Sequence, residues 1–282
     1  MDLPLEDEFG DILRKAMIGT HFDARSLAAA TGIDERHIAG WARSGGAASQ
    51  EQARALATPL HLDPARFADS AAARWYPQAV EAPEVRRHAQ RPHPSNGYIF
   101  SLEDANRAAL VDPAGLPENV LRAVADGAYD VQYILITHKH ADHCDATAQV
   151  AAAFPHATIV MHELDVHAIG ALAPKALLVG DGGELPLRNG ASIGMLHTPG
   201  HTDGSACYRF KSTVFTGDTL FAGSVGGAYG DASTYDDILE SIRSKLFTLT
   251  PETVVMPGHG PPTTIAQELA HNPFFPPPLP SR

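Results

Sequence analysis

The first part of the chain carries apolar residues at helical spacing in short stretches, each beginning near a residue that can cap a helix. These stretches are FGDILRKAMI (9–18), RSLAAAT (25–31), DERHIAGWARS (34–44), SQEQARALATPL (49–60) and DPARFADSA (63–71). They predict five short helices that together form a small all-α domain over residues 1–75.

The pattern changes after residue 75. Residues 76–95 contain four prolines and little periodicity, which is typical of a linker or of a strand that leads into a new domain. From residue 96 onward, short apolar segments alternate with turns and with helical stretches. This alternation predicts a layered α/β domain over residues 96–282. The predicted strands are YIF, AALV, YILIT, TIVM, IGML, ACYRF and TVFT.

Composition narrows the classes of function. The formal net charge of −12 disfavours general binding to nucleic acid or to anionic membranes, because both would be repelled at long range. The two cysteines, Cys144 and Cys207, form neither a CxxC pair nor a disulfide framework, and the N-terminus lacks the features of a signal peptide. No apolar run reaches the length of a membrane span. We therefore expect a soluble cytoplasmic protein with no membrane partner.

Metal-binding side chains are concentrated at the end of one predicted strand. The stretch THKHADHCD (137–145) directly follows the apolar run VQYILI. His138 and His140 stand two positions apart, so in an extended segment both can reach one ion. Asp142 and His143 follow on the next turn and can face a second ion. An isolated histidine is usually structural, but four potential ligands within six residues predict a metal site.

Three further strand ends repeat this signal. His201 lies in a glycine-containing turn after one apolar strand, Asp218 ends another, and His259 follows a third through a Pro-Gly turn. The ends of neighbouring strands meet at one edge of a sheet, where α/β proteins commonly build sites. We expect these separated residues to join the first group.

The motifs HKHADH, HTPGHTDGS, TVFTGDTL and PGHG together resemble the metallo-β-lactamase fold superfamily. The resemblance covers residues 96–282 and implies a four-layer αβ/βα sandwich with metals at one rim of its two sheets. It implies that His138, His140 and His201 hold one metal, that Asp142, His143 and His259 hold a second, and that Asp218 bridges the two. Asp112 matches a residue that supports the ligands from behind.

The ligand types fit two divalent metal ions. Imidazoles and carboxylates suit zinc, which we expect first, and also iron or manganese. Two ions that share a carboxylate and a water would generate a bridging hydroxide able to attack an acyl carbon. The expected chemistry is hydrolysis, with Asp142 as the catalytic residue that orients the water or passes a proton onward.

The C-terminal half is most similar to the glyoxalase II-like hydrolases, which implies a small-molecule thioester or related acyl substrate. In those relatives the loop after the bridging aspartate continues with an arginine that can contact a carboxylate of glutathione. Here Gly227 takes that position, followed by Ala228 and Tyr229. The expected anion contact is therefore missing, and Tyr229 is a candidate to line a pocket for a less charged thioester, lactone or ester.

Two alternatives remain open. A persulfide dioxygenase-like enzyme would hold one iron through His138, His201 and Asp218. A DNA-binding regulator is the other, because SLAAATGIDERHIAGWARSG resembles the helix-turn-helix of phage repressors. Residues 1–75 hold eight basic against eleven acidic residues, which favours a packing or homodimer-forming module over a nucleic-acid partner.

Overall fold

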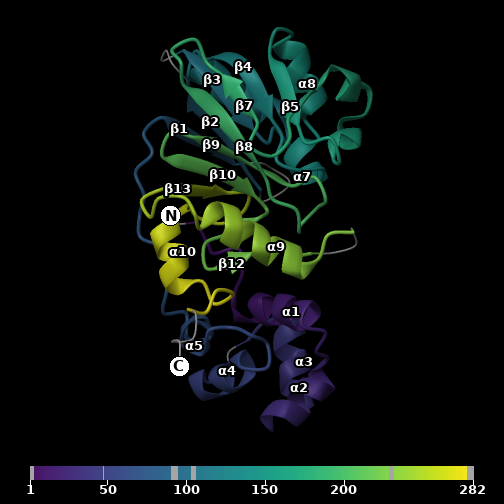
Figure 1. The fold of residues 1–282 in the computed structure, drawn as a ribbon, viewed down its shortest axis with the longest axis vertical. Coiled ribbons are helices and arrows are strands. Elements are labelled where there is room, and N and C mark those ends of the chain that lie inside the picture. The colour runs from purple at the N-terminus through teal and green to yellow at the C-terminus, as the bar shows by residue number, and fades with distance from the viewer. Residues whose placement is uncertain (1–2, 47, 90–94, 103–105, 229–231, 278–282) are drawn as a thin grey trace.

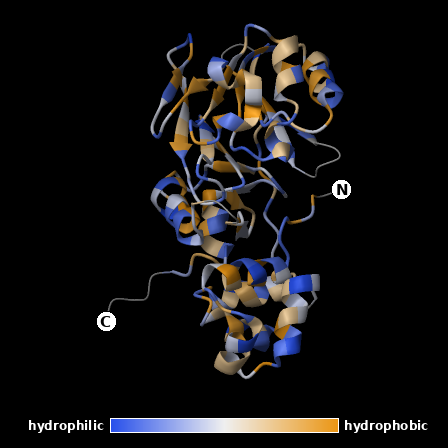
Figure 2. Ribbon diagram, turned by 90° about the vertical axis from the view of Figure 1, so that its right-hand side faces the viewer, coloured by the Kyte–Doolittle hydropathy of each residue, from blue (hydrophilic) through white to orange (hydrophobic). Residues whose placement is uncertain are grey.

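The computed structural model of the protein describes residues 3–46, 48–89, 95–102, 106–228 and 232–277. A helical region comes first along the chain, and the sheets follow it, in the order expected from the sequence (Figure 1). Figure 2 shows hydrophobic residues concentrated along the strands, whereas the helices carry both colours. Across these ranges, no helix combines the length and the apolar character needed to cross a membrane.

Within the described residues before position 75, the chain forms the five helices that the apolar spacing predicts. Side-chain oxygens cap several first turns: Asp23 accepts a hydrogen bond from a helix amide at 2.7 Å, and Asp63 accepts two at 2.9 Å. Gly32 ends the second helix with a φ of +75°, a left-handed conformation that glycine adopts without strain. The helices are α1 (Phe9–Gly19), α2 (Ala24–Thr31), α3 (Glu35–Ser44), α4 (Gln50–Ala57) and α5 (Pro64–Ala71).

Two six-stranded sheets follow in the described part of the chain. The first contains, in spatial order, β1 (Val85–Ala89), β2 (Asn96–Ser101), β3 (Arg107–Val111), β4 (Asp130–Leu135), β5 (Thr158–Met161) and β6 (Leu177–Leu178). The second contains β14 (Thr263–Thr264), β13 (Val254–Pro257), β10 (Thr213–Gly217), β9 (Ala206–Phe210), β8 (Ser192–His197) and β7 (Glu184–Pro186). Strands β3 to β6 are parallel, as are β10 and β13, and the other neighbours are antiparallel. A hairpin of β11 (Leu220–Phe221) and β12 (Ser224–Val225) lies apart from both sheets.

Alternating residues along the strands divide the apolar side chains between two faces. In β2, Tyr98 and Phe100 join the cluster between the sheets, while Ile99 joins the cluster under the helices that cover the first sheet. In β10, Phe215 faces inward and Val214 faces the helices that cover the second sheet. The result is the predicted four-layer αβ/βα sandwich. The covering helices are α6 (Pro117–Asp126), α8 (Thr147–Ala153) and η1 (Val166–Lys175) on one side, and α9 (Tyr235–Ser241), η2 (Ile242–Leu246) and α10 (Ile265–His271) on the other.

The N-terminal helices pack against the helices of the second sheet. Leu13 and Phe67 share one buried apolar cluster with Ile238 and Phe274, and Figure 1 places α9 and α10 between the sheets and the N-terminal helices. Arg66 donates three hydrogen bonds, at 2.6 to 3.1 Å, to backbone carbonyl groups between residues 269 and 275. One buried cluster therefore joins the helical region to the helix-covered face of the second sheet. The domain limits at residues 75 and 95 stay predictions, and β1 forms inside the stretch expected to be a linker or a leading strand.

A buried ion pair fixes the segment that precedes α1. The side chains of Lys15 and Asp7 are only 8% and 5% exposed, and they contact each other directly. Lys15 also donates to the carbonyl oxygen of Val225 at 2.8 Å, and Ser224 donates to the Asp7 carboxylate at 2.5 Å. The segment is thus attached to β12, and its release would leave buried charges without partners.

Replacing Asp7 with Ala removes one member of this pair and leaves the Lys15 ammonium buried without its counter-charge. We expect the free energy of unfolding to fall by about 3–5 kcal/mol, measured by urea denaturation. Arg14→Ala, next to Lys15 on α1, is the matched control. Its ion pair with Asp11 is exposed, at 42% for Arg14 and 34% for Asp11, so its loss should change the free energy of unfolding by less than about 1 kcal/mol. Equal stability of Asp7→Ala and the parent protein would show that the pair does not hold the segment.

Candidate metal centre

The predicted ligands gather at one edge of the two sheets, where strands end. His138 follows β4, Asp218 directly follows β10, and His259 follows β13. His201 lies in the turn after β8, and the short helix α7 (Ala141–Cys144) carries two more of the predicted residues. All seven predicted residues fall into three overlapping groups, and within each group the potential ligand atoms lie within 4.8 Å of one another.

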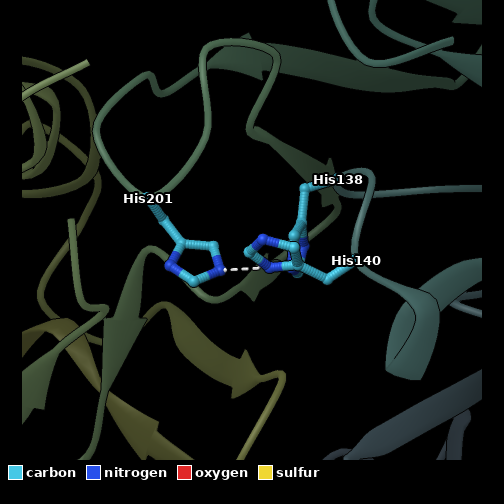
Figure 3. A group of neighbouring side chains, drawn as sticks. All are labelled: His138, His140 and His201. Atoms are coloured by element: carbon cyan, nitrogen blue, oxygen red, sulfur yellow. Dashed lines mark hydrogen bonds between the residues drawn. The ribbon is translucent and has the colours of Figure 1, made fainter. Parts of the chain in front are cut away.

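The first group contains His138 and His140, from the loop after β4, and His201, from the turn after β8, and their rings approach one another (Figure 3). Nδ1 of His201 donates to the carbonyl oxygen of Gly227 at 2.7 Å, which leaves Nε2 directed at the group. That Nε2 lies 2.8 Å from Nδ1 of His140. The backbone carbonyl sets the ring orientation of His201, so its Nε2 points toward the other two histidines.

The second group contains Asp142, His143 and His259. Oδ2 of Asp142 lies 3.3 Å from Nε2 of His259 and 3.6 Å from Nε2 of His143. Asp218 lies between the groups: its Oδ2 is 3.5 Å from Nε2 of both His201 and His259, and its Oδ1 is 3.3 Å from Nε2 of His143. One carboxylate therefore faces both groups.

Asp112 supports this arrangement from behind. Its Oδ1 accepts a hydrogen bond from the Thr137 amide at 2.8 Å, and its Oδ2 accepts one from the Thr137 hydroxyl at 2.8 Å and lies 2.9 Å from Nδ1 of His143. This contact places a proton on Nδ1 of His143 and directs its Nε2 at the site. Position 258 requires glycine, because a Cβ there would lie 2.3 Å from Oδ1 of Asp218.

The electrostatics favour a charged carboxylate among imidazoles. Burial alone would raise the pKa of Asp218, but the neighbouring His143 and His259 hold it well below its usual range. Burial lowers the pKa of His138 and of His201, so both are neutral and offer a lone pair. Burial also opposes protonation of His259. The carboxylates of Asp218 and Asp142 nevertheless raise the pKa of His259 to about 10.

Several buried atoms of the site lack a hydrogen-bond partner among the described residues. Three of them are Nε2 of His138, Nε2 of His143 and Oδ1 of Asp218. Unpaired buried polar atoms are costly, and these face the same space. Cations placed there would satisfy all of them. The donor set therefore fits a pair of divalent metal ions, and imidazole with carboxylate suits zinc, iron or manganese.

The sequence analysis did not identify Asp165, which links the loop after β4 to the turn after β8. Asp165 is fully buried, and its carboxylate accepts hydrogen bonds from the Lys139 amide at 3.0 Å, the Thr202 hydroxyl at 2.6 Å and the Gly204 amide at 3.2 Å. It thereby sets the distance between the loop after β4 and the turn after β8. Asp165 lies in no motif and follows a different strand, so the chain pattern carried no signal for this role.

Replacing Asp218 with Ala removes the carboxylate that faces both groups. We expect the variant to lose both metal ions, whereas the parent protein keeps about two per chain, as in sites where two ions share a carboxylate. The measurement is elemental analysis after dialysis against dilute zinc. Asp126→Ala, at the exposed end of α6, is the control and should keep the metal content of the parent. Retention of both ions by Asp218→Ala would contradict the position of Asp218 between two ions.

Comparisons with known proteins agree with this geometry. The model of the "Metallo-beta-lactamase superfamily" matches residues 91–259. Hydroxyacylglutathione hydrolase GloC of Haemophilus influenzae is 31% identical over 189 residues, which cover 61% of this chain and 89% of that protein. The crystal structure of ETHE1 from Myxococcus xanthus is 30% identical with a TM-score of 0.59, over 67% of this chain and 83% of that one. The structure of TTHA1623 in a di-iron-bound form is 29% identical with a TM-score of 0.56, over 71% of this chain and all of that one (100%).

The matched region contains both clusters of metal-binding side chains and most of the strands that position them. It begins after the helical region, so the helices before residue 75 lie outside the part that the family model describes. The agreement of motif, strand order and matched range leads to one conclusion: this chain belongs to the metallo-beta-lactamase superfamily.

Proposed function

We propose that the protein is a metal-dependent hydrolase of a thioester or a related acyl compound, using two divalent ions, with zinc expected first. The observation that carries this proposal is the position of Asp218, whose carboxylate lies within 3.5 Å of His201 in the first group and of His143 and His259 in the second. When bound, two such ions supply an activated water and polarise the substrate carbonyl. The similarity to a hydroxyacylglutathione hydrolase supports the same class of reaction.

Each group of side chains has a distinct part in this proposal. His138, His140 and His201 would hold one ion, and Asp142, His143 and His259 would hold the other. Asp142 is more open than its neighbours, with 29% of its side chain exposed. Burial tends to raise its pKa, but the hydrogen bond with His259 and the charge of His143 lower it overall. An ionised Asp142 beside the open side of the site can accept a proton from water.

An ionised Asp142 favours a thioester over an amide. A carboxyl group that stays ionised is a weak proton donor, so the site suits a leaving group that departs without being protonated. A thiol has a pKa of about 8.5 and leaves readily as the thiolate, whereas an amine must be protonated first. We therefore place thioesters before lactones and esters, and well before amides.

The second candidate is a mononuclear-iron enzyme of the persulfide dioxygenase type, for which the likeness to ETHE1 gives some support. Such an enzyme needs only His138, His201 and Asp218 as ligands. Asp142, His143 and His259 form a further group whose potential ligand atoms lie within 4.8 Å of one another, which favours the two-ion hydrolase.

Thiol release and oxygen consumption separate the two candidates. We expect the zinc-loaded protein to release thiol from simple thioesters, and we expect chelation to abolish this activity because both the nucleophile and the carbonyl activation depend on metal. The assays are a thiol-reactive chromophore and an oxygen electrode with a persulfide. One iron per chain, oxygen uptake and no thiol release from any thioester would overturn the hydrolase proposal.

The loop after Asp218 bears on the choice of thioester. Gly227 presents only backbone to the site, and its carbonyl oxygen is already bonded to His201. No side chain at this position can pair with a glutathione carboxylate. Tyr229, the candidate pocket residue, lies outside the described residues.

We expect the protein to turn over a glutathione thioester and a truncated thioester of the same acyl group with similar efficiency. Without the charged contact, which is worth roughly 1.5–3 kcal/mol, the two kcat/KM values should agree within about tenfold. Steady-state kinetics on the matched pair tests this. If kcat/KM for the glutathione thioester exceeded that for the truncated thioester more than a hundredfold, the inference drawn from Gly227 would be wrong. A basic side chain elsewhere in the protein would then contact the glutathione carboxylate.

The charge of α3 gives no comparable support to DNA binding. Arg36, one of its few cationic side chains, is ion-paired with Asp34 at 2.8 Å. An arginine held by a carboxylate offers less net charge to a phosphate. For this reason we propose hydrolysis, and not DNA binding through residues 1–75, as the function.

A further inference from the structure

The segment before α1 reaches the candidate metal centre. Oε2 of Glu6 lies 3.6 Å from Nδ1 of His259, and 35% of the Glu6 side chain is exposed. The superfamily model begins at residue 91, so this carboxylate comes from a part of the chain that the model does not cover. The N-terminal region therefore contributes a charged group within contact range of a proposed ligand.

His259 has a proton that needs an acceptor. Its Nε2 faces Asp142 and Asp218, which is the side where an ion would bind. An imidazole that binds a cation through Nε2 carries its proton on Nδ1, and metal-binding histidines usually donate that proton to a carboxylate or a carbonyl group. Nδ1 of His259 is buried and has no hydrogen-bond partner among the described residues, while Glu6 is the acidic side chain beside it.

The chain is built to admit Glu6 at this position. Gly260 follows His259 with a φ of +73°, and a Cβ on it would lie 3.0 Å from the Glu6 amide nitrogen. Any other residue there would be strained and would press on the incoming segment. The next residue, Asp7, is fixed by its bonds with Lys15 and Ser224, so the backbone at Glu6 is held on its C-terminal side.

The ring of His259 is restrained on another side as well. Phe221 packs edge-on against it with 5.9 Å between ring centroids, and the Lys15 ammonium lies 5.1 Å from the centre of the Phe221 ring. Lys15, which anchors the N-terminal segment, thus also contacts the aromatic ring that packs against His259.

We propose that Glu6 is a positioning residue of the metal centre, which accepts a hydrogen bond from Nδ1 of His259 and fixes the orientation and basicity of that ligand. The inference rests on His259 as a ligand in the proposed function, but it is independent of the substrate. It also gives the N-terminal helical region a role in metal binding, because the packing of its helices and its buried ion pair deliver a carboxylate to the site of the second ion.

Metal affinity tests this role directly. Zinc binding to the full-length protein is measured by competition with a chromophoric chelator, and the melting temperature of the metal-free protein is recorded in parallel. We expect Glu6→Ala to weaken binding of one of the two ions about 10- to 100-fold, with the other ion unaffected. Glu6→Gln keeps an acceptor oxygen and should show an intermediate loss. Glu51→Ala removes an acidic side chain from α4 of the same helical region and should bind both ions as the parent does.

The control measurement separates positioning from general destabilisation. The proposal predicts that Glu6→Ala melts, when metal-free, at the temperature of the parent. Parental affinity for both ions in Glu6→Ala would overturn it, as would equal weakening of both ions together with a lowered metal-free melting temperature. A protein that binds two ions in this Glu6-dependent way but hydrolyses no acyl substrate would refute the hydrolase proposal and leave the role of Glu6 intact.

Discussion

A buried carboxylate at the end of β10 is the constraint on which the site depends. Asp218 is removed from water yet ionised, so positive charge must surround it. The fold meets this demand by ending four strands of two sheets at the same edge, which brings imidazoles to both oxygens. Asp112 and Asp165 then orient the loops that carry them. The same arrangement creates the space that two cations fit.

The parts of the site that the sequence could predict share one property. Each predicted ligand stands directly after an apolar strand or in the turn that follows it, and strand ends at one sheet edge meet for geometric reasons. The starts of helices could be predicted equally well, because capping residues such as Asp23 and Asp63 can be recognised in the local sequence. The four-layer sandwich followed from the family resemblance that the motifs carry, whereas the alternation of strands with turns and helices predicted only a layered α/β domain.

Other features had no local signal. Asp165 acts on loops that are distant in the sequence, and Glu6 reaches His259 across more than two hundred positions. An amphipathic helix shows which of its faces is buried but not what covers that face. The packing of α1 and α5 on α9 and α10 was therefore outside what periodicity can predict, although the helices themselves were not. Only the folded chain shows that the N-terminal region and the sandwich share a core.

The central claim is that seven side chains from the ends of four strands surround two metal ions, with Asp218 between them. Anomalous diffraction from crystals of the zinc-loaded protein, recorded on both sides of the zinc absorption edge, tests it most directly. We predict two peaks, one beside His138, His140 and His201 and the other beside Asp142, His143 and His259. A single peak, or peaks away from Asp218, would contradict the claim.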